Sequence, residues 1–153
     1  MTYSKQRKIY ITLSAIAVIA VMIIIFCLSA QVSDTSEETS GSFIAWIKAF
    51  LGIDFSQEVI RTLAHFCEYA GLGFLVTNLF FACKQRLMPI ISAICSWAYA
   101  WTDEIHQIFV EGRAFQLSDL SVDLCGILLG TVVFIILIKF INILKNKKHI
   151  SSH

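Results

Sequence analysis

Four long apolar runs dominate the pattern of hydrophobic and polar positions along the chain. Each run is long enough for a membrane-spanning helix, which needs about 20 predominantly apolar residues. The first run carries no charge, whereas the other three carry acidic side chains near one end. The runs are Ile9–Leu28, Leu63–Cys83, Leu87–Val110 and Leu117–Ile138. The pattern predicts an all-α membrane protein, a bundle of about four transmembrane helices.

The acids of the last three runs are predicted to lie at one depth. In each case an acid is separated by 16 or 17 positions from a basic residue at the other end of the run. At about 1.5 Å per residue this separation is roughly 24–26 Å, and the hydrocarbon core of a bilayer is about 30 Å thick. Ionisable groups at such a depth usually face a bundle interior or a wet cavity. The pairs are Glu68 with Lys84, Asp103 with Arg86, and Asp123 with Lys139.

Composition and charge agree with one membrane domain. Of the 153 residues, 57% are hydrophobic and 15% are charged, which excludes an ordinary soluble domain. Nine of the 12 Lys and Arg residues form three clusters beside the runs, and the positive-inside rule places all three in the cytoplasm. We therefore expect a multi-pass protein of the cytoplasmic membrane with both termini inside. Its parts are a cytoplasmic N-terminus (1–8), a transmembrane domain (9–138) and a basic cytoplasmic tail (139–153).

The first run also resembles a cleaved signal peptide in its basic start. Its apolar stretch of about 20 residues, however, exceeds the usual signal core of about 7–15 residues. Leu28 is also a poor fit to the small residue expected before a cleavage site. We expect an uncleaved span.

The segment between the first two runs is expected outside the membrane. Residues 31–41 are polar and typical of a loop, whereas Ser42–Ile53 is amphipathic but too short to span. We interpret this short segment as a helix in the outer interface. The alternative is a flap over the polar site, or a surface that takes up an amphiphile through Phe43, Trp46 and Phe50.

Helical spacing groups the polar side chains of the second and fourth runs into faces. Arg61, His65 and Glu68 stand four and three residues apart, which stacks them on one face. Asp119 and Asp123 are four residues apart on the fourth helix. Both aspartates are expected to lie against neighbouring helices.

The third run carries the densest polar group. Asp103, His106 and Gln107 are predicted to share a face, while Glu104 points about 100° away from Asp103. Arg113 follows in the next loop and is expected just above the cluster.

Small residues and a proline predict local packing. Gly126 and Gly130 form a small-xxx-small pattern that lets a neighbouring helix approach closely. Pro89 suits the first turn of the third helix. Gly112, with polar neighbours, predicts a tight outer turn between the third and fourth helices.

The acids outnumber the arginines that could balance them. Buried carboxylates need a counter-charge, a metal or shared protons, so either some acids are protonated or a cation enters. A simpler alternative is that the polar groups only pair with one another and fix packing. The spacing matches no known zinc signature, and a divalent metal is suggested only by donor chemistry. The suitable donors are His65, Glu68, Asp103, His106 and Asp123.

Other classes of function lack their characteristic residues. The chain has no serine elbow, phosphate loop or Cys-x-x-Cys pair, and its basic residues flank spans rather than forming a nucleic-acid-binding surface. The five cysteines, Cys27, Cys67, Cys83, Cys95 and Cys125, are interpreted as small buried hydrophobic residues.

Four motifs in this order resemble the VanZ-like family of bacterial membrane proteins. The resemblance covers about residues 9 to 138, and its third-helix motif is the most specific. One departure is Glu111, at a position where the family commonly has proline, although Gly112 and Arg113 are in place. The motifs are FCLSAQ (Phe26–Gln31), HFCEYAGLG (His65–Gly73), DEIHQIFVEGR (Asp103–Arg113) and SDLSVDLCG (Ser118–Gly126) followed by Gly130.

The resemblance implies a role in the bacterial cell envelope. The namesake of the family is associated with low-level resistance to teicoplanin without altered peptidoglycan precursors. The partners implied are the lipid bilayer and a lipid-linked cell-wall precursor or lipoglycopeptide.

Two functions remain open. In the first, which we place ahead of the second, the outer site binds an amphiphilic ligand. In the second, the protein is a membrane enzyme, with or without a metal, that acts on a lipid-linked substrate at the outer leaflet. The candidate catalytic residues are Asp103, Glu104 and His106. The candidate ligand-binding residues are His65, Glu68, Gln107, Arg113, Asp119 and Asp123.

Overall fold

The computed structural model describes residues 4–30 and 56–150, and its regular structure in these ranges is helical. The predicted outer loop and the short amphipathic segment Ser42–Ile53 lie outside the described residues. The helices are α1 (Lys5–Ser29), α3 (Gln57–Lys84), α4 (Pro89–Gln107) and α5 (Leu117–Ile150).

Three of these helices, α1, α3 and α5, are long and apolar enough to cross a membrane. The fourth, α4, has 19 residues and carries two adjacent acids, Asp103 and Glu104. The prediction of an all-α membrane protein is confirmed, and crossing is supported for α1, α3 and α5. That α4 also crosses the membrane stays a prediction.

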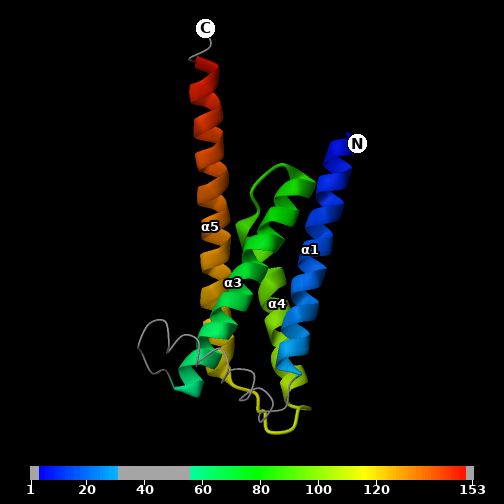
Figure 1. Cartoon of the computed structure of the whole chain (residues 1–153), viewed down its shortest axis with the longest axis vertical. Helices are drawn as coiled ribbons and strands as arrows, with labels where there is room; N and C mark the ends of the chain where they lie inside the picture. The colour runs from blue at the N-terminus through cyan, green and yellow to red at the C-terminus, as the bar shows by residue number, and fades with distance from the viewer. Residues whose placement is uncertain (1–3, 31–55, 151–153) are drawn as a thin grey trace, which may run out of the picture.

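Helix α3 is the centre of the bundle, since it contacts α1, α4 and α5. It packs most extensively against α5, and neighbouring helices along the chain run in opposite directions (Figure 1). Both ends of the chain and the α3–α4 connection lie toward the same end of the bundle, and α5 extends beyond it (Figure 1). The core between the helices is built around Tyr69, Leu72, Ala100 and Ile127.

Glycines allow α3 and α5 to lie almost backbone to backbone. A Cβ atom added at Gly126 would collide with the Phe66 carbonyl oxygen, and one added at Gly130 would collide with that of Ala70. On the facing helix, a Cβ at Gly73 would lie 2.5 Å from the Ile127 carbonyl oxygen. The predicted packing role of Gly126 and Gly130 is therefore confirmed.

Local signals explain where the helices begin and end. The Ser56 side chain caps α3 by accepting a hydrogen bond from the Val59 N–H, as expected at an N-cap. Gln85 ends α3 in a left-handed conformation, with φ of 55°. Pro89 begins α4, where its missing N–H costs nothing. Gly112 adopts a φ of 76° in the turn before α5, so the predicted helix start at Pro89 and the predicted turn at Gly112 are confirmed.

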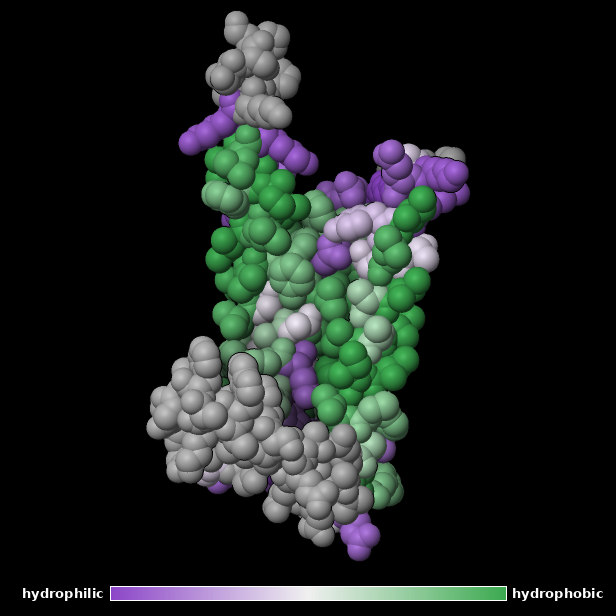
Figure 2. All heavy atoms as spheres, in the orientation of Figure 1, coloured by the Kyte–Doolittle hydropathy of each residue, from purple (hydrophilic) through white to green (hydrophobic). Residues whose placement is uncertain are grey.

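Arg7 connects two helices at the end of the bundle that carries the basic clusters. Its Nε donates to the Ala82 carbonyl oxygen at 3.2 Å, and its Nη2 donates to that of Cys83 at 2.8 Å. This side chain therefore joins the start of α1 to the last turn of α3, where free carbonyl groups favour a cation. Hydrophilic surface gathers at this end, around the two chain termini (Figure 2).

The interpretation of the cysteines as buried is wrong. Four of them are exposed on the bundle surface, Cys83 is partly exposed, and all five are free. A helix in a membrane is apolar on its lipid-facing side as well as on its inner side. An apolar run alone therefore does not separate buried from lipid-facing cysteines.

Candidate functional site

Polar side chains of α3, α4 and α5 meet in the interior at the end of the bundle opposite the basic clusters. Figure 2 shows a strip of hydrophilic surface in the same half of the molecule, between hydrophobic flanks. Six predicted site residues are buried here: His65, Asp103, Glu104, Gln107, Asp119 and Asp123. We call this group the polar cluster.

Asp103 receives hydrogen bonds from three helices. Its Oδ1 accepts from the Ser29 hydroxyl of α1 at 2.5 Å, and its Oδ2 accepts from the Tyr69 hydroxyl of α3 at 3.2 Å. Gln107, one turn further along α4, donates from Nε2 to Oδ2 at 3.5 Å. Both carboxylate oxygens are therefore partnered, and Asp103 fixes the positions of α1, α3 and α4 relative to one another.

His65 and Asp123 join α3 to α5 at the same level. His65 Nδ1 lies 3.2 Å from Asp123 Oδ1, and both side chains are buried. The second oxygen of Asp123, Oδ2, is buried and has no hydrogen-bond partner. One of the two carboxylate oxygens of Asp123 therefore lacks a hydrogen-bond donor.

Glu104 approaches this pair from α4. Its Oε2 accepts from the Gln116 backbone N–H at 2.9 Å, which ties α4 to the start of α5. Its Oε1 is buried without a partner. One ligand atom from each of His65, Glu104 and Asp123 lies within 4.8 Å of the other two. Together these residues offer an imidazole nitrogen and two carboxylates, which are donors suited to a divalent metal.

Arg61 and Asp119 form an ion pair beside the cluster. Arg61 Nη2 lies 3.3 Å from Asp119 Oδ2 and donates to Gln116 Oε1 at 3.0 Å. Arg113, in the α4–α5 connection, is half-buried. Burial and the nearby Arg61 lower the pKa of the Arg113 guanidinium, and the carboxylates around it act in the opposite direction. Two cations therefore lie on the loop side of the acids.

Glu68 is only partly buried, and it is close enough to His65, Asp103 and Asp123 to interact with them electrostatically. The structure thus brings the expected acids of α3, α4 and α5 to one level. The five acids of this region outnumber Arg61 and Arg113, as the sequence indicated.

The inward face of α4 differs from the expected one. At this end of α4 the buried residues are Asp103, Glu104 and Gln107, whereas His106 is partly exposed and packs against Phe26 of α1, with ring centroids 4.3 Å apart. His106 is therefore separated from the metal-capable group, and Glu104 takes the inner place. The reason is that α4 is buried along a stripe of serines and alanine, which are Ser92, Ser96 and Ala100.

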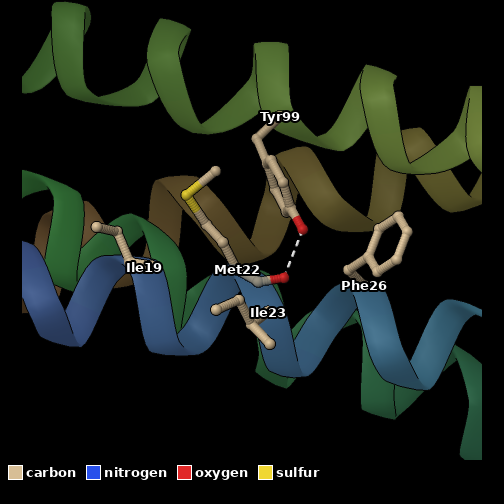
Figure 3. Close-up of a pocket in the computed structure, with 5 residues that line it drawn as sticks. All are labelled: Ile19, Met22, Ile23, Phe26 and Tyr99. Atoms are coloured by element: carbon tan, nitrogen blue, oxygen red, sulfur yellow. Dashed lines mark hydrogen bonds between the residues drawn. The ribbon is translucent and has the colours of Figure 1, made fainter.

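An apolar groove lies between α1 and α4. It has a volume of about 310 Å³ and opens on the bundle surface. The Tyr99 hydroxyl crosses from α4 and donates to the Met22 carbonyl oxygen at 2.6 Å (Figure 3). The lining residues are Ile19, Met22, Ile23, Phe26 and Tyr99. Phe26 therefore faces both this groove and His106.

Sequence reasoning missed three residues that organise the site. Ser29 and Tyr69 hold Asp103, and Gln116 contacts both Glu104 and Arg61. The available signals were weak. Tyr69 lies four residues after His65, on the same face of the helix, and Ser29 ends the first apolar run.

The comparison with protein families gives a match over most of the chain. The model described as VanZ/LLP1 matches residues 14–139, which include α3, α4, most of α1, the first part of α5 and the complete polar cluster. No curated protein and no solved structure gives a significant match.

Proposed function

This chain belongs to the VanZ-like family, and from that premise we propose that it is a cell-envelope protein that binds an amphiphile. The loop side of the polar cluster, where Arg61 and Arg113 lie, would receive the head of the ligand, and the groove between α1 and α4 would receive its acyl chain. In a bacterial host this binding would lower susceptibility to teicoplanin-type glycopeptides, which carry an acyl chain.

The observation that carries the proposal is the contact between the groove and His106 at the acid-bearing end of α4. Phe26 lines the groove and packs against the His106 ring, and His106 Nδ1 is a buried atom without a hydrogen-bond partner. An apolar groove beside a polar atom that lacks a hydrogen-bond partner suits a molecule with an apolar tail and a polar head. The position of this contact within the span of α1 would place the tail at the depth of lipid acyl chains.

The positive charge of two arginines supports a ligand with an anionic or zwitterionic head group. Arg61 and Arg113 lie at the loop side of the site, and guanidinium groups bind carboxylates and phosphates through paired hydrogen bonds. Cell-wall precursors and glycopeptides both carry such groups. The acids deeper in the bundle would then hold the helices in register rather than contact the ligand.

A second candidate, a membrane enzyme acting on a lipid-linked substrate, is favoured by one observation. His65 and Asp123 are paired beside the free oxygen of Glu104, and an oriented imidazole next to a carboxylate is a common general acid–base arrangement. Asp103 and His106 support it less, because Asp103 is fully hydrogen-bonded and His106 faces α1. We therefore place binding first.

The test is antibiotic susceptibility of a sensitive Gram-positive host that expresses this chain. We expect protection against teicoplanin and little against vancomycin, which lacks the acyl chain. Asp103→Asn, compared at equal membrane abundance, is expected to reduce the protection. Equal protection against both antibiotics would contradict a role for the acyl chain, and no protection from the normal chain would contradict the proposed function.

A direct measurement complements the host test. The purified chain in lipid nanodiscs would be titrated with teicoplanin and with vancomycin, and binding of teicoplanin alone is expected. Unchanged binding by Asp103→Asn together with lost protection would assign the effect of that substitution to a later step than binding.

A further inference from the structure

We propose that His65, Glu104 and Asp123 form a binding site for one divalent transition-metal ion, such as Zn²⁺. The site lies inside the polar cluster, and each of its residues comes from a different helix: α3, α4 and α5. This inference does not depend on the proposed binding of an amphiphile.

The geometry of the donors carries the proposal. One ligand atom of each residue lies within 4.8 Å of the others, and all three residues are buried. His65 Nδ1 and Asp123 Oδ1 are 3.2 Å apart. Two ligands of a tetrahedral zinc ion, each about 2.1 Å from the metal, lie about 3.4 Å from one another. The observed spacing therefore fits an edge of a metal coordination shell as well as a hydrogen bond.

Two unsatisfied oxygens provide a second and independent observation. Glu104 and Asp123 are each 1% exposed, and Glu104 Oε1 and Asp123 Oδ2 have no hydrogen-bond partner. Buried polar atoms are almost always partnered, and leaving one without a partner costs about 1–3 kcal/mol. Two such oxygens, on two residues of one three-residue group, are available as ligands for a cation.

Local charge balance points the same way. Arg61 of α3 pairs through Nη2 with Asp119 and Gln116, so its described ion pair is with a carboxylate outside the three-residue group. A buried pair of carboxylates with one imidazole still needs positive charge. The imidazole donor favours a transition metal over Mg²⁺ or Ca²⁺, which prefer an all-oxygen shell. Three protein ligands would leave a further position for water or for an oxygen of a ligand.

The test is metal retention by the full chain, purified in detergent with an affinity tag that contains no histidine. The protein would be loaded with ZnCl₂, passed through a desalting column, and analysed for zinc by mass spectrometry. We expect about one zinc per chain. His65→Ala, Glu104→Gln and Asp123→Asn are each expected to lower the retained zinc at least tenfold, because losing only a residue that hydrogen-bonds to a metal ligand already costs about 10–100-fold in affinity.

Matched controls separate this site from other donors. Asp119→Asn removes a buried carboxylate outside the group, and His106→Ala removes the other described histidine of this end. Both are expected to keep the zinc. Loading with Co²⁺ adds a spectroscopic check, since nitrogen and oxygen ligands give only weak visible bands. A strong thiolate band in the near ultraviolet would place the metal at cysteines and overturn the proposal.

A thermal measurement covers the case in which a substitution disturbs folding. Zn²⁺ bound to the folded chain raises the unfolding temperature by mass action. We expect this rise for the normal chain and for Asp119→Asn, and none for Asp123→Asn. No retained zinc in the normal chain, or equal retention in all variants, would overturn the metal site. Neither result would affect the susceptibility test of the proposed function, and failure of that test would leave the metal site intact.

Discussion

The Ser29 hydroxyl donates a hydrogen bond of 2.5 Å to Asp103 Oδ1, and this contact joins the last turn of α1 to the acid-bearing end of α4. Because Tyr69 of α3 binds the other oxygen, Asp103 is held by hydroxyl groups from two helices. Hydroxyl donors hold a carboxylate in place without neutralising its charge. The site is therefore built to position Asp103 as well as to bury it.

Removal of the Ser29 hydroxyl is expected to destabilise the bundle. Ser29→Ala leaves Asp103 Oδ1 buried without its donor, so we expect a loss of about 1–2 kcal/mol in the free energy of unfolding. Thermal or denaturant unfolding of the purified chain in micelles measures this change. Ser121→Ala is the control, because Ser121 is exposed and donates only to Leu117 of its own helix. Equal stability of the two variants would contradict the structural role of Ser29.

The close contact between α3 and α5 gives a second prediction. In Gly130→Ala the new methyl group would collide with the backbone at Ala70, so the helices must separate, at a cost of about 1–3 kcal/mol. Gly71→Ala is the matched control, since a Cβ there meets nothing within 4 Å. The unfolding temperature of each variant tests the contrast, and a Gly130→Ala chain as stable as Gly71→Ala would disprove the close approach.

The groove between α1 and α4 can be filled without altering the polar cluster. Ile23→Trp places a large ring in the groove, and we expect it to abolish most of the protection against teicoplanin. Ile24→Trp serves as the control, because Ile24 is 54% exposed against 57% for Ile23 but does not line the groove. Minimum inhibitory concentrations at equal membrane abundance measure the effect. An equal loss of protection in both variants would mean that any large side chain on α1, rather than occupation of the groove, causes the effect.

Orientation in the membrane is a separate prediction. The basic clusters are expected in the cytoplasm, so the α4–α5 connection should face outward. In a cysteine-free variant, Glu111→Cys should react with a membrane-impermeant maleimide added to intact cells, and Lys147→Cys should react only after lysis. The opposite pattern of labelling would reverse the sidedness of the site.

The fold was predictable because a membrane imposes a simple rule on sequence. Four apolar runs of helical length gave four helices, although α5 extends past the run to Ile150 because a helix need not end where its apolar residues do. Pro89 and Gly112 also predicted the local structure observed around them.

The common level of the acids along the bundle was predictable, but their individual contacts were not. The spacing from basic residues placed Glu68, Asp103 and Asp123 at one level, and the structure brings them together. Which side of α4 faces inward could not be read from that helix alone, because Glu104 and His106 are both polar and only neighbouring helices decide between them. The contacts of Ser29 with Asp103 join residues 74 positions apart, and no local pattern encodes such a contact.

The glycine contact between α3 and α5 also has a consequence for biosynthesis. The two helices in this contact, α3 and α5, are separated in the chain by α4. Helices are synthesised in order from the N-terminus. His65 therefore enters the membrane before its partner Asp123 has been translated. Glu104 likewise lacks a hydrogen-bond donor until the segment that carries Gln116 has been made. The cluster closes only when the last helix arrives, so a chain arrested before α5 would display uncompensated polar groups in lipid and would be a natural substrate for membrane proteases.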